Sequence, residues 1–322
     1  MQVGARKMVV LGTGGTIAGT ASDGADNIGY KAGQVGVQQL LGAVPGLARV
    51  AGGELVAEQV AQLDSKDMDF GVWLRLAQRC QAHLADPQVQ GIVITHGTDT
   101  LEETAWFLRL VLEASKPVVL TCAMRPATAL APDGPQNLLD AFAVAATPGA
   151  RGVVAVAAGV LHGAAQVRKV HPYRVDAFDS GDAGPLGWVE EGRVRLARDW
   201  PDAAAVYPGA LAWLAEPAAA WPRVEVVMSH AGASGRLVDL LVADGIDGLA
   251  VAATGNGTLH QDLEAALLRA QAAGVRVRVT SRCALGRVLP RPGDALVADE
   301  AGLGAVKLRV SLLLELLAAR KG

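Results

Sequence analysis

Residues 7–19 read KMVVLGTGGTIAG, an apolar run that ends in a glycine-rich turn. The run at 7–11 is short and contains two valines, which is typical of a buried strand. Comparable apolar runs return further along the chain, at 91–95, 117–121 and 152–158. Segments with helical periodicity at 69–84 and 100–114 lie between these runs. This alternation predicts βαβ units and a largely parallel sheet.

The alternation is interrupted once, where the composition changes. Residues 200–222 are rich in Ala and Pro and show no clear succession of strand and helix. Beyond them the pattern resumes, with strands expected at 224–228, 248–252 and 275–280 and helices near 234–243, 259–273 and 306–319. We therefore expect two α/β domains. They are a larger N-terminal domain at 1–198 with a mainly parallel, flavodoxin-like sheet flanked by helices, a linker at 199–221, and a smaller C-terminal α/β domain at 222–322.

The overall composition excludes several classes of protein. Of the 322 residues, 51% are hydrophobic, which is enough for a sizeable core and excludes a disordered chain. Lys and Arg total 29 and Asp and Glu total 32, so the net charge is −3, and no basic excess points to a nucleic-acid binder. The 3 cysteines are far apart and form no CxxC or Cys/His spacing, so neither a disulfide framework nor a zinc site is expected.

The sequence carries no visible targeting or membrane segment. Its first residues, MQVGARKMVVLGTGG, contain no long apolar stretch of the kind that marks a signal peptide. The longest apolar run, at 152–161, is too short to span a bilayer. We therefore expect a cytoplasmic protein without membrane contact, with a leader-trimmed periplasmic form as the alternative.

The glycine-rich turn after the first strand is the first chemical clue. A dinucleotide-binding fingerprint would need glycine where Ile17 stands, and a phosphate-binding loop would need Gly-Lys-Ser/Thr. What remains is a flexible loop with two hydroxyls, those of Thr13 and Thr16. The loop is either a plain tight turn or a place where backbone amides and a threonine hydroxyl face a ligand.

A second polar loop, HGTDT at 96–100, directly follows the strand expected at 91–95. Ligands of parallel sheets bind at the carboxyl ends of the strands, which favours a functional role for Thr98 and Asp99. Taken alone, Asp99 is more typical of a helix N-cap, since the helical pattern starts with the next residue. We interpret His96 as a packed histidine, because the sequence has no Ser-His-Asp or GxSxG pattern.

Lys169 and Tyr30 are two further candidates for chemistry. A lysine in a polar loop is usually a solvated charge, but one held beside a threonine hydroxyl in a dry site can act as a base. Tyr30 stands in the polar, glycine-containing stretch 22–36. A tyrosine there is mildly unusual in a chain with only 3 tyrosines, and its alternative is an ordinary surface residue.

Taken together, TGGTIAG at 13–19 and HGTDT at 96–100 resemble the two signature motifs of the bacterial-type L-asparaginases. The resemblance continues in order over nearly the whole chain, through DSKDM at 64–68, EETA at 102–105, AMRP at 123–126, DGP at 133–135, GPLG at 184–187 and GNG at 255–257. It implies hydrolysis of the side-chain amide of L-asparagine to L-aspartate and ammonia, with no metal and no cofactor.

The resemblance also implies roles for individual residues. Thr13 is expected to be the attacking nucleophile, and Tyr30, on a mobile loop that closes over the substrate, its hydrogen-bond partner. Thr98 is expected to be the second essential threonine, with Lys169 beside it. The carboxylate of Asp99 would bind the amino group of the substrate, which matches opposite charges on a zwitterionic ligand.

The remaining substrate contacts are expected from three further positions. Ser65 would hold the substrate carboxylate, and backbone amides beside Thr98 and Ala123 would stabilise the oxyanion that forms during attack. Asn256 would reach the site from the C-terminal part of a neighbouring subunit. The resemblance therefore implies a homo-oligomer, a tetramer built from intimate dimers, whose other partner is the small substrate and not nucleic acid.

Two departures from the family pattern bear on the substrate. The segment CALGRV at 283–288 offers no obvious match to the acidic residue that a neighbouring subunit supplies in other members. Asp294, Asp299 and Glu300 are the possible substitutes. Lys66 stands where some members carry an uncharged amide, and its cation would repel the substrate ammonium if it pointed inward, but not if it pointed outward.

Three functions stay open. The first is an asparaginase, and the second is a mixed glutaminase-asparaginase, since one methylene changes the affinity of a pocket by only about 1–3 kcal/mol. The third is a non-catalytic binder of an amino acid on an α/β scaffold. A mere binder would not need the whole set of Thr13, Tyr30, Thr98, Asp99 and Lys169.

Overall fold

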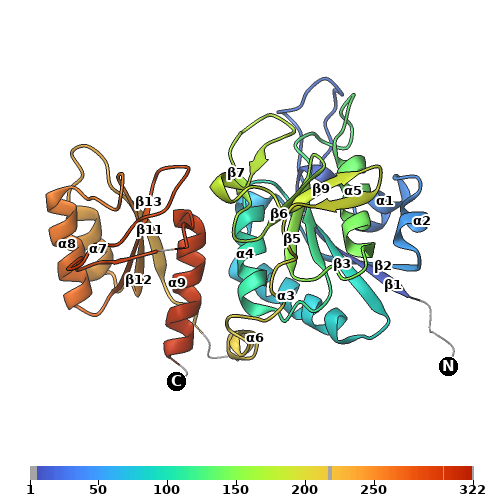
Figure 1. Cartoon of the computed structure of the whole chain (residues 1–322). Helices are drawn as coiled ribbons and strands as arrows, with labels where there is room; N and C mark the ends of the chain where they lie inside the picture. The colour runs from blue at the N-terminus through green and yellow to red at the C-terminus, as the bar shows by residue number, and fades with distance from the viewer. Residues whose placement is uncertain (1–5, 217–219, 300, 321–322) are drawn as a thin grey trace. The chain divides into compact units, whose positions relative to one another are not determined.

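The structure is a computed structural model that describes residues 6–216, 220–299 and 301–320. The chain divides into two compact units, Met1–Leu211 and Ala212–Gly322. Both are α/β units built on mainly parallel sheets (Figure 1), so the expected fold class is confirmed. The division falls within helix α6 (Ala210–Leu214), inside the segment expected to be a linker. The expected domain boundaries themselves stay a prediction.

Unit 1 contains an eight-stranded sheet in the order β10-β9-β6-β5-β4-β3-β1-β2. Its strands are β1 (Lys7–Gly14), β2 (Glu54–Leu63), β3 (Val89–Thr95), β4 (Val118–Thr121), β5 (Val153–Ala157), β6 (Val160–Gly163), β9 (Gly187–Glu190) and β10 (Arg193–Leu196). The strands from β2 to β5 in this order are parallel, whereas β6, β9 and β10 extend the sheet in antiparallel fashion. A separate antiparallel pair joins β7 (Arg168–Lys169) to β8 (Phe178–Asp179).

Helices cover both faces of this sheet (Figure 1). One face carries α1 (Val37–Gly42), α2 (Leu47–Ala51) and α5 (Gly134–Ala146), and the other carries α3 (Phe70–Ala85) and α4 (Leu101–Val111). Short 3-10 helices lie in three loops, namely η1 (Thr16–Ala18), η2 (Ser65–Asp67) and η3 (Gly181–Ala183).

Strand β1 shows why the central strands read as unbroken apolar runs. Met8, Val9, Val10 and Leu11 are all 0% exposed. Successive side chains of a strand point to opposite faces, and Met8 and Val10 join the core that α2 and α5 cover. Val9 and Leu11 therefore face the helices on the opposite side. Each such side chain stabilises the fold by about 1.5–3 kcal/mol when it is fully buried.

Several elements of unit 1 lie outside the expectations from sequence, and β2 and α5 show why. β2 is an edge strand with no fully buried residue, so its sequence ELVAEQVAQL contains no continuous apolar run. α5 begins with Gly134 and Pro135, a pair that is typical of a turn, although proline also suits the first turn of a helix. In both cases the position in the fold, and not the local sequence pattern, decides the structure.

Unit 2 is built on a four-stranded parallel sheet in the order β11-β12-β13-β14. Its elements are β11 (Val224–Met228), α7 (Arg236–Ala243), β12 (Gly248–Ala253), α8 (Gln261–Ala272), β13 (Arg276–Ser281), β14 (Val297–Ala298) and α9 (Ala305–Ala319). Gly248 lets α9 approach the sheet, because a Cβ there would lie 2.9 Å from Leu316 Cδ1. Within the described residues, no helix has the length and apolar character that crossing a membrane requires.

Candidate active site

Three loops meet in close contact at the carboxyl ends of β1, β2 and β3. Gly14 and Gly15 have positive φ angles of 102° and 82°. A Cβ on Gly15 would lie 2.4 Å from Gly97 Cα, and a Cβ on Gly97 would lie 2.4 Å from Ser65 Oγ. No side chain fits at either glycine, so these positions allow the polar residues around them to come together.

The two threonines of the first loop have different surroundings. Thr13, still in β1, is 1% exposed, and its Oγ1 donates a hydrogen bond of 2.9 Å to the carbonyl of Thr95. Thr16 opens η1, and its Oγ1 lies 2.6 Å from the hydroxyl of Tyr30. The expected pairing of Tyr30 with Thr13 is therefore wrong. The two left-handed glycines between the threonines turn the second one, and not the first, toward the tyrosine.

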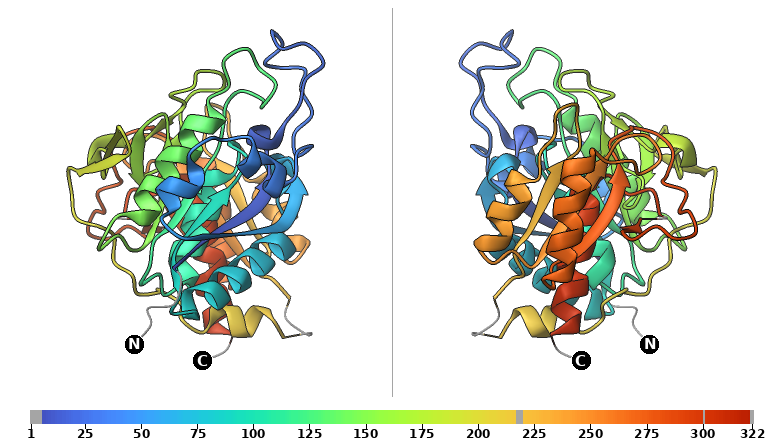
Figure 2. Two further views of the ribbon diagram at one scale, coloured as in Figure 1. Left: turned by 90° about the vertical axis from the view of Figure 1, so that its right-hand side faces the viewer. Right: turned by 90° about the vertical axis from the view of Figure 1, so that its left-hand side faces the viewer.

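Tyr30 belongs to the loop 20–31, which is closed at its base by two backbone hydrogen bonds. Burial raises the pKa of its phenol above the usual value, and the hydrogen bond with Thr16 opposes this shift. The phenol is therefore protonated at neutral pH. In Figure 2 this loop, in blue, rises beside the green loop that follows β4. The two loops are joined there, since Leu130 N donates to Gly24 O at 3.0 Å.

The second loop supplies Thr98 and Asp99 to a cluster of three paired side chains, and β7 supplies the third, Lys169. Lys169 Nζ donates to Thr98 Oγ1 at 2.8 Å and to Asp99 Oδ1 at 2.6 Å. The Lys169 side chain is 17% exposed and that of Asp99 is 50% exposed, so the carboxylate stays accessible from solvent. The N-cap residue of α4 is Thr100, so Asp99 is not engaged as a helix cap. The fold thus brings together predicted site residues that are far apart in sequence.

Ser65 ties the loop after β2 to this cluster. It is 2% exposed, and its Oγ accepts a hydrogen bond of 3.1 Å from the backbone N–H of Asp99. The neighbouring Lys66 places its Nζ 2.9 Å from Asp64 Oδ2 and 3.2 Å from Asp67 Oδ2, and its side chain is 62% exposed. Two carboxylates therefore hold and neutralise this ammonium at the surface.

His96 lies in a buried chain of hydrogen bonds. Its Nδ1 is 2.7 Å from the carbonyl of Gly97, and its Nε2 is 2.9 Å from Thr104 Oγ1. That Thr104 oxygen accepts a hydrogen bond of 2.9 Å from Trp73 Nε1, which leaves its own proton for Nε2. An indole N–H only donates and a carbonyl only accepts, so the proton of the neutral ring sits on Nδ1. Burial lowers the pKa of His96 to about 4. The interpretation of His96 as a packed, backbone-bonded histidine is confirmed.

The loop after β4 carries Ala123, which is 1% exposed. It adjoins Cys122, whose thiol pKa is raised by burial, as is typical of a core residue and not of a nucleophile. The backbone N–H groups of Met124 and Arg125 both donate to the carboxylate of Asp133, each at 2.9 Å. The sequence offers Asp133 only as part of a motif, and no local pattern indicates that it binds this loop.

Asn256 lies in unit 2, where both ends of its amide are bound. Its Nδ2 donates to the carbonyl of Leu289 at 3.0 Å, and its Oδ1 accepts from the N–H of the same residue at 2.7 Å. The expected contact of Asn256 with the site of a neighbouring subunit stays a prediction. Of the acidic substitutes, Asp294 and Asp299 each accept a local backbone N–H, and Glu300 lies outside the described residues.

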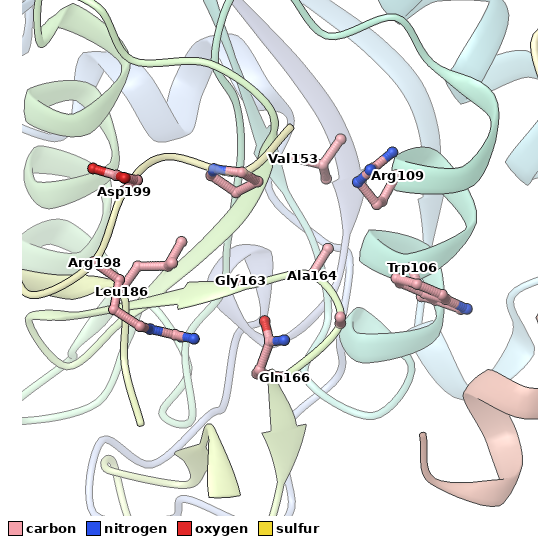
Figure 3. A pocket seen from close by; sticks show the side chains of 11 residues that line it. Trp106, Arg109, Val153, Gly163, Ala164, Gln166, Leu186, Arg198 and Asp199 are labelled. Atoms are coloured by element: carbon pink, nitrogen blue, oxygen red, sulfur yellow. The ribbon is translucent and has the colours of Figure 1, made fainter. Parts of the chain in front are cut away.

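A cavity of about 250 Å³ in unit 1 has a different lining (Figure 3). Its polar groups include those of Arg109, Gln166 and Arg198, and its described lining includes none of the predicted site residues. Both guanidinium groups already bind the chain, Arg198 through two main-chain carbonyls and Arg109 through one. The cavity is therefore not the candidate active site. Among the described residues, no group of three or more His, Cys, Asp or Glu is arranged to hold a metal ion.

Two regions of the chain match described protein families. Residues 7–202 match "Asparaginase, N-terminal" and residues 223–316 match "Glutaminase/Asparaginase C-terminal domain". The chain belongs to the asparaginase family. The two matches together span most of the chain, in the order that the sequence motifs predict, so the resemblance to the asparaginases is confirmed.

Relatives in the asparaginase family are similar over most of their length. The chain is 37% identical to L-asparaginase 2 of Escherichia coli K12, over 87% of this chain and 78% of that protein. It is 36% identical to the glutaminase-asparaginase of Pseudomonas fluorescens biotype A, over 89% of this chain and 78% of that protein. The crystal structure of a probable cytoplasmic L-asparaginase from Campylobacter jejuni is 35% identical, with a TM-score of 0.90 over 98% of this chain and 96% of that one.

Proposed function

We propose that this chain hydrolyses the side-chain amide of L-asparagine to L-aspartate and ammonia. One observation carries the proposal: two buried threonine hydroxyls follow neighbouring strands, and each is paired with an ionisable side chain. Thr16 is paired with Tyr30 after β1, and Thr98 with Lys169 after β3. A threonine hydroxyl is a weak nucleophile until a neighbouring group activates it. The names of the Escherichia coli and Campylobacter jejuni relatives support the same activity.

Thr16 is the hydroxyl that we assign to attack on the substrate amide. Its partner is the protonated phenol of Tyr30. As the threonine oxygen bonds to the amide carbon, its proton passes to the phenol oxygen, and the phenol releases its own proton to solvent. Water then hydrolyses the acyl-threonine, which restores the Thr16 hydroxyl and releases L-aspartate. The Thr13 hydroxyl instead donates to a main-chain carbonyl inside the sheet, and release of its proton would break that buried hydrogen bond. We therefore move the proposed nucleophile from Thr13 to Thr16, and assign to Thr13 the role of fixing the end of the strand.

The pair of Thr98 and Lys169 supplies the proton for the departing ammonia. The Thr98 oxygen accepts the hydrogen bond of Lys169, and its own proton has only a long contact of 3.5 Å to Asp99 Oδ1. That proton is donated to the amide nitrogen as the C–N bond breaks, and a proton of the ammonium group replaces it on the threonine. General acid catalysis of this kind contributes about 10²–10⁴-fold to the rate.

We assign recognition of the charged groups of the substrate to Asp99 and Ser65. The carboxylate of Asp99 is half exposed and suits the substrate ammonium. The Ser65 oxygen accepts the N–H of Asp99, so its hydroxyl hydrogen is available as a donor to the substrate carboxylate. Backbone amides beside Thr98 and Ala123 are the proposed donors to the developing oxyanion.

A mixed glutaminase-asparaginase is the second candidate function, because the Pseudomonas fluorescens relative carries both activities in its name. Ammonia release from L-asparagine and from L-glutamine, measured side by side over a wide concentration range, tests both candidates. We expect the higher kcat/KM with asparagine, and similar values would select the mixed enzyme. Release from neither amide would contradict the proposed function and favour the non-catalytic binder.

We also propose a homotetramer built from intimate dimers, in which the loop around Asn256 completes the site of a neighbouring subunit. Membership of the asparaginase family supports this assembly. Because the amide of Asn256 is bound to Leu289, its contribution would come through the loop that this pair holds in place. Sedimentation of the active protein tests the proposal, and a fully active monomer would contradict it.

For the cellular location we keep the cytoplasm as a prediction. The Campylobacter jejuni relative, which is named a probable cytoplasmic L-asparaginase, supports this location, and a leader-trimmed periplasmic form is the alternative. Osmotic-shock fractionation of cells that express the protein from its own gene separates the two, since release with the periplasmic fraction would contradict the prediction.

A further inference from the structure

Asp133 occupies the N-cap position of α5 but does not cap the helix. An aspartate at this position ordinarily accepts a backbone N–H from the first turn of its own helix. Here the side chain makes no such bond, and its two oxygens accept the N–H groups of Met124 and Arg125 in the preceding loop, each at 2.9 Å. The Asp133 carboxylate therefore does not cap its own helix, and instead it holds the loop that carries Ala123.

Asn137 lies one turn further along α5 and is 2% exposed. Its Nδ2 donates to the carbonyl of Cys122 at 3.0 Å and to Asp133 Oδ2 at 3.2 Å, and its Oδ1 accepts from the N–H of Ala158 at 2.9 Å. Ala158 has a φ angle of 49°, which is unfavourable for a residue with a Cβ. Asn137 therefore joins the ends of β4 and β5 and orients the Asp133 carboxylate.

These bonds fix the direction of the peptide groups next to Ala123. In a planar trans peptide, the carbonyl and the N–H point in opposite directions. Because the N–H of Met124 points at Asp133, the carbonyl of Ala123 points away from that carboxylate. Two successive N–H groups on one anion form a nest, which sets the backbone of the whole loop.

The same helix end also contacts the loop of the proposed nucleophile. A Cβ on Gly134 would lie 3.0 Å from Ile17 Cγ1 and 3.5 Å from Ala123 Cβ. Ile17 directly follows Thr16 in η1. The start of α5 is therefore packed against both the first loop and the loop after β4, without a side chain of its own in between.

We propose that Asp133, supported by Asn137, is a positioning residue that sets the Ala123 peptide against the Thr16 loop. Neither residue is assigned a contact with substrate. The inference rests on the proposed function in one respect only, that Ala123 borders the reacting amide. The rate would then depend on the Asp133 carboxylate as well as on the paired hydroxyls.

The test compares Asp133→Asn with a matched variant on the same helix, Asp140→Asn. Both remove one carboxylate charge, and Asp140, which is 4% exposed, accepts from Gln136 and not from the loop. We expect Asp133→Asn to lower kcat for asparagine about 10- to 100-fold with KM nearly unchanged, because a small misplacement of reacting groups costs about that much. We expect Asp140→Asn to keep kcat within about twofold, whatever its effect on stability.

Hydrogen exchange of the segment 122–126 gives a second readout that does not depend on activity. We expect faster exchange of the Met124 and Arg125 amides in Asp133→Asn and wild-type exchange in Asp140→Asn. Unchanged exchange in a folded Asp133→Asn would overturn the inference. So would a kcat of Asp133→Asn equal to that of an active wild type. An inactive wild type with faster exchange in the variant would contradict the proposed function, but not the role of Asp133 in holding the loop that carries Ala123.

Discussion

The carboxyl ends of the two sheets carry polar residues in similar places but bind them to different partners. In unit 2, Asn256 uses both ends of its amide on main-chain groups. In unit 1, Thr13 likewise binds a main-chain carbonyl, but Thr16 binds the side chain of Tyr30 and Thr98 that of Lys169. Two parallel α/β sheets of one chain thus use the same edge in two ways.

The difference lies in what each kind of hydrogen bond can do. A side chain bound to the main chain fixes a loop, and its release costs a hydrogen bond without offering another proton acceptor or donor. A hydroxyl bound to an ammonium or a phenol can pass a proton when a substrate arrives. We therefore place the chemistry in unit 1, at Thr16, Tyr30, Thr98 and Lys169, and assign loop stability to the polar edge of unit 2.

Lys169→Met should give the largest loss among the changes that break this comparison. It keeps an unbranched side chain of nearly the same length but removes the ammonium group that binds Thr98 and Asp99. We expect kcat for asparagine to fall about 100- to 1,000-fold or more. Lys7→Met is the matched control, since it removes another lysine that pairs with an aspartate, Asp86, at 3.3 Å. A Lys169→Met enzyme as active as this control would contradict the proton relay.

His96 extends the comparison, because it lies in unit 1 and its ring binds both the main chain, at Gly97, and a side chain, that of Thr104. Its pKa of about 4 in the fold lies below the ordinary value of 6.5. Between these values the unfolded chain binds a proton that the folded chain does not, so the free energy of unfolding falls as pH drops from 6.5 to 4. The contribution of His96 to this fall is about 3 kcal/mol, and above pH 6.5 it vanishes.

Urea unfolding at a series of pH values measures this effect, with His96→Gln as the variant that cannot titrate. We expect the stability of the variant to depend less on pH than that of the wild type between pH 6.5 and 4. Parallel curves for the two proteins would show that the imidazole is protonated in the fold, against its buried, neutral assignment.

Asn256→Ala sharpens the comparison from the side of unit 2. It removes both hydrogen bonds to Leu289, and we expect a loss of about 1–2 kcal/mol in the free energy of unfolding. Gln261→Ala, at an exposed position of α8, is the control and should change stability by less than about 0.5 kcal/mol. A large loss of kcat with unchanged stability would instead assign Asn256 to the chemistry of a neighbouring site.

Lys66→Gln should give the smallest effect. Asp64 and Asp67 already neutralise the ammonium, which is held at the surface. An exposed ion pair is worth about 0–1 kcal/mol, so we expect kcat and KM for asparagine to stay within about twofold. A tenfold fall in KM would show that Lys66 repels the substrate ammonium from within the site.

The central strands were predictable because their residues are apolar on both faces, as Met8 to Leu11 are in β1. β2 was not, since an edge strand needs no unbroken apolar run. The cluster of Thr98, Asp99 and Lys169 came from the family resemblance, because the residues lie about 70 positions apart and no local spacing relates them.

The contacts that the sequence did not predict correctly have a common physical origin. Whether Tyr30 pairs with Thr13 or Thr16 depends on the left-handed turn between the threonines, and a motif does not display φ angles. Asp133 stands in the sequence only as part of the DGP motif, and the fold alone places the amides of the preceding loop within its reach. Contacts that depend on turns and on the approach of loops are therefore the ones that sequence reasoning missed.

The steady-state rate of ammonia release from asparagine by Thr16→Val and Thr13→Val tests the central claim most directly. Both changes remove one hydroxyl from the same turn and nearly preserve the shape of the side chain. We expect Thr16→Val to lower kcat about 1,000-fold or more. Thr13→Val should keep kcat within about tenfold and lose about 1–3 kcal/mol of stability, because the buried carbonyl of Thr95 loses its donor. An active Thr16→Val beside a folded but inactive Thr13→Val would contradict the claim and return the nucleophile to Thr13.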